Sequence, residues 1–440
     1  MNRRLLSAAT IGLALVTAVA TTSLPASATS TTTRASSSAR ASARCPQLRL
    51  TDQWYGTTGK RLQKVIDRVG RCKGSPGRGV RPVAVFDWDN TMMKNDISDQ
   101  TTFWLLRRSL LRQPAGKDWS TTSRWMTPAA AKALRTACGP IAKPGRRLST
   151  GKKDAQSVAC ADEILSMRLD QETTGGQPGF AGDYDHRRMN AGYAWMAQLM
   201  AGRTPAQVRK IAADARRVAL RAKVGDTWRV GSTTQIKWTR YYRPMKDLVR
   251  TLKRAGIEPW VISASPELWA DVWGPGIGVP RKHVVGIRTQ VKDGRVVGHL
   301  LGCGGYADGS DQIMPFVEGK RCWINQEIRG IQGRAALRLA PARVRPVIAA
   351  GDASTDVTMV ADATRAHVVL NRNGAEIMCQ AYANQDGKWL VTPMFIQPLP
   401  QMPGRYPCST TGRERRDGSL GPVRGLDGRI IPDQRDTVFG

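Results

Sequence analysis

The sequence predicts an α/β fold: a doubly wound, Rossmann-like parallel sheet with a mostly helical cap inserted after the first motif. Four short apolar runs predict the strands, at residues 83–86, 260–262, 347–350 and 367–370. Continuous apolar runs, rather than alternating ones, are typical of strands buried on both faces of a parallel sheet. Helical patterns lie between these runs, and alternation of strand and helix is the signature of a doubly wound domain.

The helices of the core follow from apolar spacing. Residues 245–255 place Met245, Leu248, Val249 and Leu252 on one face, and Gly256 marks the end of this helix. A shorter helix is expected at 356–363, between the last two strands. The core is therefore predicted to comprise residues 45–91 and 245–393.

The stretch between the first two strands has a different character. Residues 129–137, 161–169 and 205–222 have helical patterns, Gly-rich turns such as 175–179 separate them, and no buried strand is evident. We predict a helical cap at 92–244. Residues 394–440, rich in Pro, Gly and Arg, form a C-terminal extension that either wraps the core or stays mobile. Cys408 predicts at least one tether for it.

The first residues have the pattern of an export signal. Arg3 and Arg4 precede an apolar run at 8–20, and small residues at 26–28 offer a cleavage site. The run is well short of the ~20 apolar residues of a spanning helix. Residues 29–44 lack large apolar side chains and are expected to be a disordered linker. We therefore expect a signal peptide at 1–28 and a secreted or extracytoplasmic protein without a membrane anchor.

Cysteine usage agrees with export. The chain has eight Cys, no C-x-x-C spacing and only four His, so disulfides are favoured over a zinc cluster. Eight cysteines allow roughly a hundred connectivities. We expect neighbours in sequence to pair: Cys45–Cys72, Cys138–Cys160, Cys303–Cys322 and Cys379–Cys408.

The chain is strongly basic, with a net charge of +32. Such a field attracts anions, whether phosphate esters, nucleic acid or an anionic cell surface, although a general preference for Arg would give the same composition. No helix-turn-helix, zinc-finger or RNA-binding signature supports specific nucleic-acid recognition. Nonspecific polyanion contact remains open, and the non-enzymatic alternative is a secreted basic protein that binds nucleic acid or anionic cell wall.

Polar residues directly follow three of the predicted strands. They are D-W-D-N-T at 87–91, S-A-S at 263–265 and G-D-A-S-T-D at 351–356. Ligands bind at the carboxyl ends of strands in open α/β sheets, so these side chains should converge on one edge. Clustered carboxylates require a neutralising cation, and an oxygen-rich acidic site suits Mg²⁺.

These motifs resemble those of the haloacid dehalogenase superfamily, in its phosphoserine-phosphatase-like branch, over residues 81–91 and 245–371. The resemblance implies a phosphatase in which Asp87 is the nucleophile and Asp89 the general acid and base. It implies that Ser263 binds the phosphoryl group, and that Asn90 and Thr91 shape the phosphate-binding loop. A carboxylate that attacks phosphorus forms an acyl phosphate, which divides hydrolysis into two easier steps.

The resemblance also implies a metal site and a phosphate-binding lysine. Mg²⁺ would be held by Asp87, by the backbone carbonyl of Asp89, by Asp352 and, directly or through water, by Asp356. Lys320 follows Gly319 near a helical run at 323–331 and is the favoured lysine.

Lys282 is the main competitor of Lys320, with Arg281 beside it, but both precede the strand-like segment that begins at residue 284. Ser265 precedes Pro266, so we expect it to cap a helix rather than to bind phosphate.

The substrate is expected to be a small phosphomonoester. The cap is rich in aromatic residues, which either form its core or cage a cation such as choline: Trp104, Trp119, Trp125, Trp195, Trp228, Trp238, Tyr193, Tyr241 and Tyr242. Secreted members of the resembled branch hydrolyse phosphorylcholine, which makes that ester a candidate. Transfer of the phosphoryl group to another acceptor is a second enzymatic alternative. Dehalogenation is disfavoured, because Asp89 and the further carboxylates suit metal-assisted phosphoryl transfer.

Overall fold

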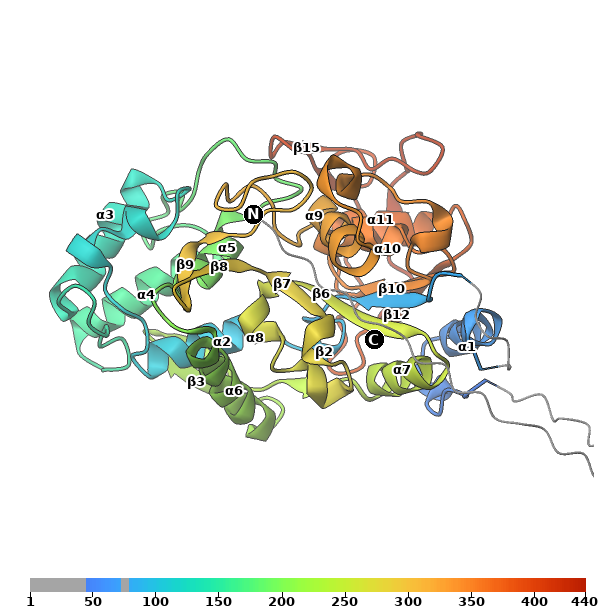
Figure 1. The fold of residues 1–440 in the computed structure, drawn as a ribbon, viewed down its shortest axis with the longest axis horizontal. Coiled ribbons are helices and arrows are strands. Elements are labelled where there is room, and N and C mark those ends of the chain that lie inside the picture. The colour runs from blue at the N-terminus through green and yellow to red at the C-terminus, as the bar shows by residue number, and fades with distance from the viewer. Residues whose placement is uncertain (1–44, 73–78) are drawn as a thin grey trace, which may run out of the picture. The chain divides into compact units, whose positions relative to one another are not determined.

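A six-stranded parallel sheet forms the centre of the computed structural model, which describes residues 45–72 and 79–440 (Figure 1). The strand order is β12-β11-β10-β1-β6-β7, and every neighbouring pair is parallel. The strands are β1 (Val83–Phe86), β6 (Glu258–Pro266), β7 (Val284–Ile287), β10 (Ile348–Gly351), β11 (Ala366–Asn371) and β12 (Trp389–Pro393). The predicted fold class is confirmed, because all four predicted strands lie in this sheet.

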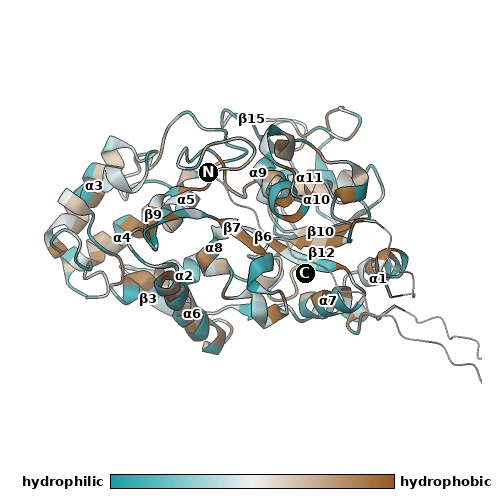
Figure 2. Cartoon of the chain, in the orientation of Figure 1, coloured by the Kyte–Doolittle hydropathy of each residue, from teal (hydrophilic) through white to brown (hydrophobic). Residues whose placement is uncertain are grey.

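Helices cover both faces of the sheet. In β1, Ala84 and Phe86 point into one apolar core, and Val83 and Val85 point into the other. The first core contains α1 (Thr58–Val69) and α7 (Arg243–Arg254), and the second contains α9 (Glu318–Trp323), α10 (Val357–Ala361) and α11 (Ala375–Ala383). The sheet strands are largely brown in Figure 2, as expected for strands enclosed by helices.

The predicted cap region is mostly helical and lies to one side of the sheet (Figure 1). Its helices are α2 (Ile97–Arg107), α3 (Pro128–Cys138), α4 (Ala155–Leu169), α5 (Ala191–Gln198) and α6 (Pro205–Arg221). Each begins after a polar residue whose side chain accepts a backbone N–H of the first turn. Helix α4 starts earlier than its apolar pattern suggested, because Asp154 caps it by accepting the Ser157 N–H at 2.9 Å.

Short strands join the cap region to its surroundings. The two ends of the insertion meet where β2 (Met93–Lys94) pairs with β5 (Arg240–Tyr241). A hairpin of β3 (Thr227–Val230) and β4 (Thr233–Ile236) follows α6. A second hairpin, β8 (Thr289–Lys292) and β9 (Arg295–Leu300), exchanges backbone hydrogen bonds with residues 202–203 that follow α5.

The C-terminal extension wraps against the core. It carries the short pairs β13 (Arg405–Tyr406) with β16 (Gln434–Arg435), and β14 (Arg413–Glu414) with β15 (Leu420–Gly421). Asp436 is completely buried and accepts hydrogen bonds from Asn371 Nδ2 at 3.0 Å and from the Tyr382 hydroxyl at 2.6 Å. The extension is therefore fastened to the end of β11 as well as to α11.

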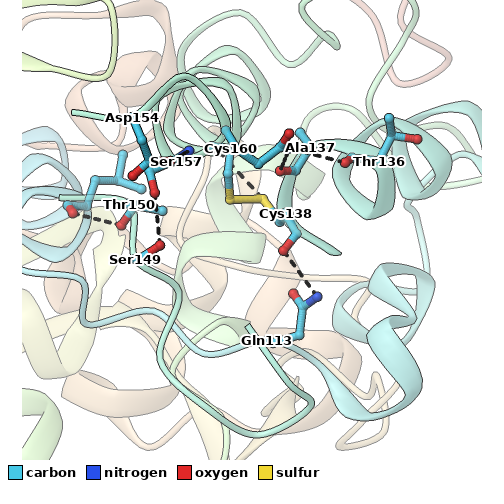
Figure 3. Close-up of a disulfide and its surroundings, with 11 residues drawn as sticks. Gln113, Thr136, Ala137, Cys138, Ser149, Thr150, Asp154, Ser157 and Cys160 are labelled. Atoms are coloured by element: carbon cyan, nitrogen blue, oxygen red, sulfur yellow. Dashed lines mark hydrogen bonds between the residues drawn. A yellow bond between two sulfur atoms is a disulfide. The ribbon is translucent and has the colours of Figure 1, made fainter. Parts of the chain in front are cut away.

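All four predicted disulfides are confirmed: Cys45–Cys72, Cys138–Cys160, Cys303–Cys322 and Cys379–Cys408. Figure 3 shows Cys138–Cys160, which joins the end of α3 to α4. Cys379–Cys408 is the expected tether of the extension.

The predicted signal peptide and linker, at 1–28 and 29–44, lie outside the described residues. Among the helices of 45–72 and 79–440, none is long and apolar enough to cross a membrane.

Candidate active site

Asp87 stands at the end of β1, in the middle of the sheet. Its backbone N–H donates to the Ala350 carbonyl of β10 at 2.9 Å, which continues the strand pairing by one residue. Because β1 lies between β6 and β10, the side chain of Asp87 can meet groups from both neighbouring strand ends. The side chain is mostly buried, and the residue is 7% exposed.

Lys320 lies between two carboxylates. Its Nζ is 2.6 Å from Asp87 Oδ1 and 2.5 Å from Asp356 Oδ1, and the side chain is fully buried. Burial disfavours the ammonium, but Asp356 and Asp87 outweigh it and raise the pKa of Lys320. Lys282, the competing lysine, is exposed in a short turn at Arg281–His283.

Asp87, Asp352 and Asp356 form a buried acidic cluster. Each offers a carboxylate oxygen, and these oxygens lie within 4.8 Å of one another. Burial and the charge of Asp356 together raise the pKa of Asp352 to about 6, against the opposing charge of Arg372. When ionised, the three buried carboxylates exceed the two cations that pair with them, Lys320 and Arg372, so the cluster keeps a negative charge. Oxygen donors with this charge fit Mg²⁺.

Asp352 and Asp356 differ in their partners. Asp352 accepts the Thr91 hydroxyl at 2.7 Å and Arg372 at 3.2 Å, so its carboxylate is held by side chains. Asp356 Oδ2 accepts the backbone N–H groups of Asp352 at 3.0 Å and Ala353 at 3.1 Å. Asp356 thus shapes the loop that presents Asp352 and at the same time holds Lys320.

Asp89 is held in a different way from Asp87. Its Oδ1 accepts the Ile97 N–H at 2.7 Å, and its Oδ2 accepts the Ser265 hydroxyl at 2.8 Å. Burial raises the pKa of Asp89 well above its ordinary value, and the nearby charges of Asp96 and Asp87 add to the rise. The protonated form of Asp89 is therefore favoured beside an Asp87 that is paired with Lys320.

The expectation that Ser265 caps a helix is wrong. Helix α8 (Glu267–Ala270) is preceded by Pro266, and no side chain caps it. Ser265 belongs to β6, and its hydroxyl points to Asp89 because the strand continues through Pro266 instead of ending at Ser263. Ser263 is completely buried, and its Oγ accepts the Ser265 N–H at 3.1 Å.

Asn90 and Thr91 lie in the tight turn after Asp89. Asn90 has a left-handed backbone, with φ of 56°, and its Oδ1 accepts the Asn95 N–H at 3.0 Å. An Asn tolerates this conformation better than most residues with a side chain. Thr91 is fully buried against Asp352.

A cavity of about 70 Å³ opens beside these groups. Its wall combines the strand ends with side chains from other segments: Asp87, Asp89, Asp96, Ser98, Arg168, Tyr193, Ala264, Ser265, Asp352, Ala353, Thr355 and Arg372. Arg168 comes from α4 and lies 2.8 Å from Asp99 of α2. Of the aromatic residues of the cap region, Tyr193 alone lines this cavity, whereas Trp119, Trp195 and Trp238 are buried in the core.

Sequence reasoning missed Arg168 and Arg372 and assigned Ser265 another role. No local pattern marks Arg168, whereas Arg372 lies just past the strand predicted at 367–370 and could have been found by its place at a strand end. Asp96 precedes an apolar run, which is the sequence pattern of a helix cap. In the structure it accepts the N–H groups of Ser98 and Asp99 in that role. That sequence pattern predicts a helix start and not a cavity wall.

A family model described as haloacid dehalogenase-like hydrolase matches residues 175–361. The matched range includes Ser263, Lys320, Asp352 and Asp356, and the fold brings Asp87 to them from upstream. Over this range the chain is similar to haloacid dehalogenase-like hydrolases. The expected resemblance to this superfamily is thereby confirmed, and the match supports the hydrolase class.

Several solved structures resemble this hydrolase at low sequence identity. A conserved protein of unknown function from Anaerococcus prevotii is 16% identical, with a TM-score of 0.56 over 76% of this chain and 90% of that one. A phosphoserine phosphatase captured as a phospho-aspartyl intermediate analogue is 13% identical, with a TM-score of 0.28 over 66% and 86%. A phosphoserine phosphohydrolase-like protein from Francisella tularensis is 14% identical, with a TM-score of 0.33 over 71% and 94%. No curated protein sequence matches this haloacid dehalogenase-like hydrolase.

Proposed function

We propose that this hydrolase is an exported, Mg²⁺-dependent phosphomonoesterase that acts through an aspartyl-phosphate intermediate on Asp87. The observation that carries the proposal is the pairing of Asp87 with the buried Lys320 beside a cavity that also holds Asp89. Asp87 is paired with a cation, whereas Asp89 accepts only a hydroxyl and a backbone N–H, and burial raises the pKa of both carboxyls. Two carboxylates in unlike environments can take the roles of nucleophile and acid.

In the first step, a carboxylate oxygen of Asp87 attacks the phosphorus of the ester. The new O–P bond forms as the bond from phosphorus to the alcohol oxygen breaks, and Asp89 donates its proton to that oxygen. The product alcohol leaves, and Asp87 carries the phosphoryl group. Ser263 and Lys320 are the proposed ligands of the phosphoryl oxygens, and the turn at Asn90 and Thr91 shapes the loop beneath them.

In the second step, the ionised Asp89 accepts a proton from water. The water oxygen attacks phosphorus, and the bond between phosphorus and the Asp87 oxygen breaks. Inorganic phosphate leaves, Asp87 is again a carboxylate, and Asp89 is again protonated. Ser265 and the Ile97 N–H hold Asp89 in place for both proton transfers.

The metal site of this proposal consists of Asp87, Asp352 and the Asp89 carbonyl, with Asp356 as a ligand directly or through water. Bound Mg²⁺ supplies positive charge that neutralises the phosphoryl oxygens and keeps the carboxylates ionised. Burial, followed by Asp356 and Asp352, otherwise raises the pKa of Asp87 against the effect of Lys320.

Two features bear on substrate and location. The cavity of about 70 Å³ next to Asp87 suits a phosphate group and little more, which favours a compact ester. It has one aromatic wall, from Tyr193, and so offers little of the cage that a choline headgroup would use.

Export is supported by the signal-like residues 1–28 together with four disulfides.

The deciding experiment is hydrolysis of a generic aryl phosphate by the oxidised, signal-free protein. We expect turnover with Mg²⁺, loss of turnover with a chelator, and a loss of at least ~1000-fold in kcat for Asp87→Asn. Asp183→Asn, at an exposed aspartate, is the matched control and should keep full activity. Absence of turnover for aryl and several small alkyl phosphates across a range of pH would overturn the proposal.

A further inference from the structure

A second, larger pocket adjoins the catalytic cavity. It has a volume of about 240 Å³ and shares Asp96 and Arg372 with the cavity beside Asp87. Its wall also includes Asn90 of the first motif, so it borders the loop that carries Asp87 and Asp89. Because Lys94 lies in its wall, we call it the Lys94 pocket. A group bonded to a phosphate at Asp87 can extend past Asp96 and Arg372 into it.

Lys94 is a buried cation with neutral partners. The residue is 9% exposed, and its Nζ donates to the Gln397 carbonyl at 3.0 Å and to Met394 Sδ at 3.5 Å. In the described part of the chain, no carboxylate forms an ion pair with it. An ammonium has three protons to donate, and burying it without an opposite charge is costly. The position of Lys94 therefore favours an anion in the pocket.

The other charges of the pocket do not neutralise Lys94. Asp99 pairs with Arg168 at 2.8 Å. Asp96 accepts two backbone N–H groups of α2 and lies 3.9 Å from the same Arg168. Both carboxylates thus face Arg168, on the side of the cap region, and neither pairs with Lys94.

Arg372 is the second cation of the pocket. Its side chain is half exposed, forms an ion pair with Asp352 and also lines the pocket. Burial lowers the pKa of Lys94, and the charge of Arg372 lowers it further against the opposite effect of Asp352, so the two cations are close enough to repel each other. An anion between them would relieve that repulsion.

We propose that the Lys94 pocket binds the leaving group of the substrate, and that Lys94 and Arg372 recognise a second anionic group on it. This inference rests on the proposed phosphomonoesterase function and adds a substrate class. The substrate is a phosphate ester whose alcohol carries a carboxylate or a second phosphate. Apolar side chains in the same wall, Phe103, Ile236, Met394 and Leu399, accommodate the carbon atoms between the two anions. The net charge of +32 favours such a doubly anionic substrate over a cationic one.

Matched esters test the inference through kinetics. We expect kcat/KM to be at least tenfold higher for phosphoglycolate than for ethyl phosphate, and higher for propane-1,3-diol bisphosphate than for propyl phosphate. The pair of esters with the larger ratio of kcat/KM values shows whether the pocket prefers a carboxylate or a second phosphate. In Lys94→Met, we expect each ratio to fall at least tenfold, mainly through KM. Lys292→Met, at an exposed lysine of β8, should leave the ratios unchanged.

A binding measurement separates this inference from the phosphatase proposal. By calorimetry, 3-phosphonopropionate should bind at least tenfold more tightly than propylphosphonate, and Lys94→Met should remove the difference. Equal binding of the two, or a preference for phosphorylcholine in turnover, would overturn the anionic subsite while the phosphatase proposal stands. Turnover of no ester, with the binding difference intact, would overturn the phosphatase proposal alone. If Lys94→Met does not fold, Arg372→Gln tests the same difference at a half-exposed side chain.

Discussion

The Ser265 hydroxyl donates a hydrogen bond of 2.8 Å to Asp89 Oδ2, which links the end of β6 to the first motif. The Ser98 hydroxyl of α2 in turn donates to Ser265 Oγ at 2.7 Å. A hydrogen bond from a hydroxyl favours the ionised carboxylate and so lowers its pKa. Ser265 therefore opposes the burial that keeps Asp89 protonated.

Ser265→Ala should raise the pKa of Asp89, because the carboxylate loses a donor. If Asp89 protonates the leaving group, the alkaline limb of the kcat/KM profile moves to higher pH. Ser98→Ala should move it in the same direction by a smaller amount, since Ser265 still donates to Asp89. Profiles of the two variants with an aryl phosphate test this. An unchanged or downward shift in Ser265→Ala would contradict the proposed role of Asp89 as acid.

Lys320→Met should destabilise the folded protein. The substitution leaves the buried Asp87 and Asp356 without their shared cation, and removing one partner of a buried ion pair typically costs about 3–5 kcal/mol. The free energy of unfolding from denaturant titration measures the loss, and kcat with an aryl phosphate should fall as well. Lys282→Met, at an exposed lysine, is the control and should change neither quantity. Equal effects of the two variants would contradict the assignment of Lys320.

The stability of the metal-free protein should fall as the pH rises from about 4 to about 7. Burial raises the pKa of Asp352 to about 6 and that of Asp99 to about 7, each above the ordinary value of 3.8. A carboxyl whose pKa is higher in the folded state favours folding at low pH, where it is protonated. That contribution is lost as the pH rises through the folded-state pKa.

Mg²⁺ should reverse this trend, because it binds the ionised carboxylates and stabilises only the folded state. Thermal midpoints in chelator and in Mg²⁺, at pH 5.5 and at pH 8, test the linkage. We expect the gain from Mg²⁺ to be larger at the higher pH. A gain that is greatest at the lower pH would exclude Asp352 as a ligand.

Asp436→Ala should loosen the C-terminal extension. It removes a buried acceptor of the Asn371 amide and the Tyr382 hydroxyl, at a cost of about 1–3 kcal/mol for the unsatisfied donors. Limited proteolysis should then cut the extension faster, and kcat/KM should fall because Asn371 precedes Arg372. Asp427→Ala, at an exposed aspartate of the same segment, should leave both unchanged. Equal protease resistance of the two variants would contradict a fastening role for Asp436.

The core of the fold was predictable because its strands are continuous apolar runs. Residues 83–86 and 347–350 have no charge, which is typical of a strand buried on both faces of a sheet. The edge strand β12 was not singled out, because its segment is short, mixed in character and ends at Pro393. The order of the strands required the structure, since pairing joins segments far apart in the chain.

The motifs placed the carboxylates of the candidate site, but not the groups around them. Ser263 and Ser265 stand two residues apart and so share one face of a strand, and the sequence alone could not decide which of them meets Asp89. Lys94, Arg168 and Arg372 are three among 67 Lys and Arg residues. In such a basic chain, the role of one cation can be inferred only from the residues around it, and those residues come from other segments.

The central place of β1 has a consequence for how the molecule folds. Val83 pairs with Glu258 and Ala84 with Ile348, so the first strand to be synthesised finds its partners only after most of the chain has followed. The four disulfides, in contrast, link cysteines 19 to 29 residues apart and can close soon after each pair emerges. Non-local pairing slows folding and leaves apolar strands exposed to aggregation while they wait. Refolding of the denatured, disulfide-intact chain should therefore be slow, with assembly of the sheet around residues 83–86 as its late step.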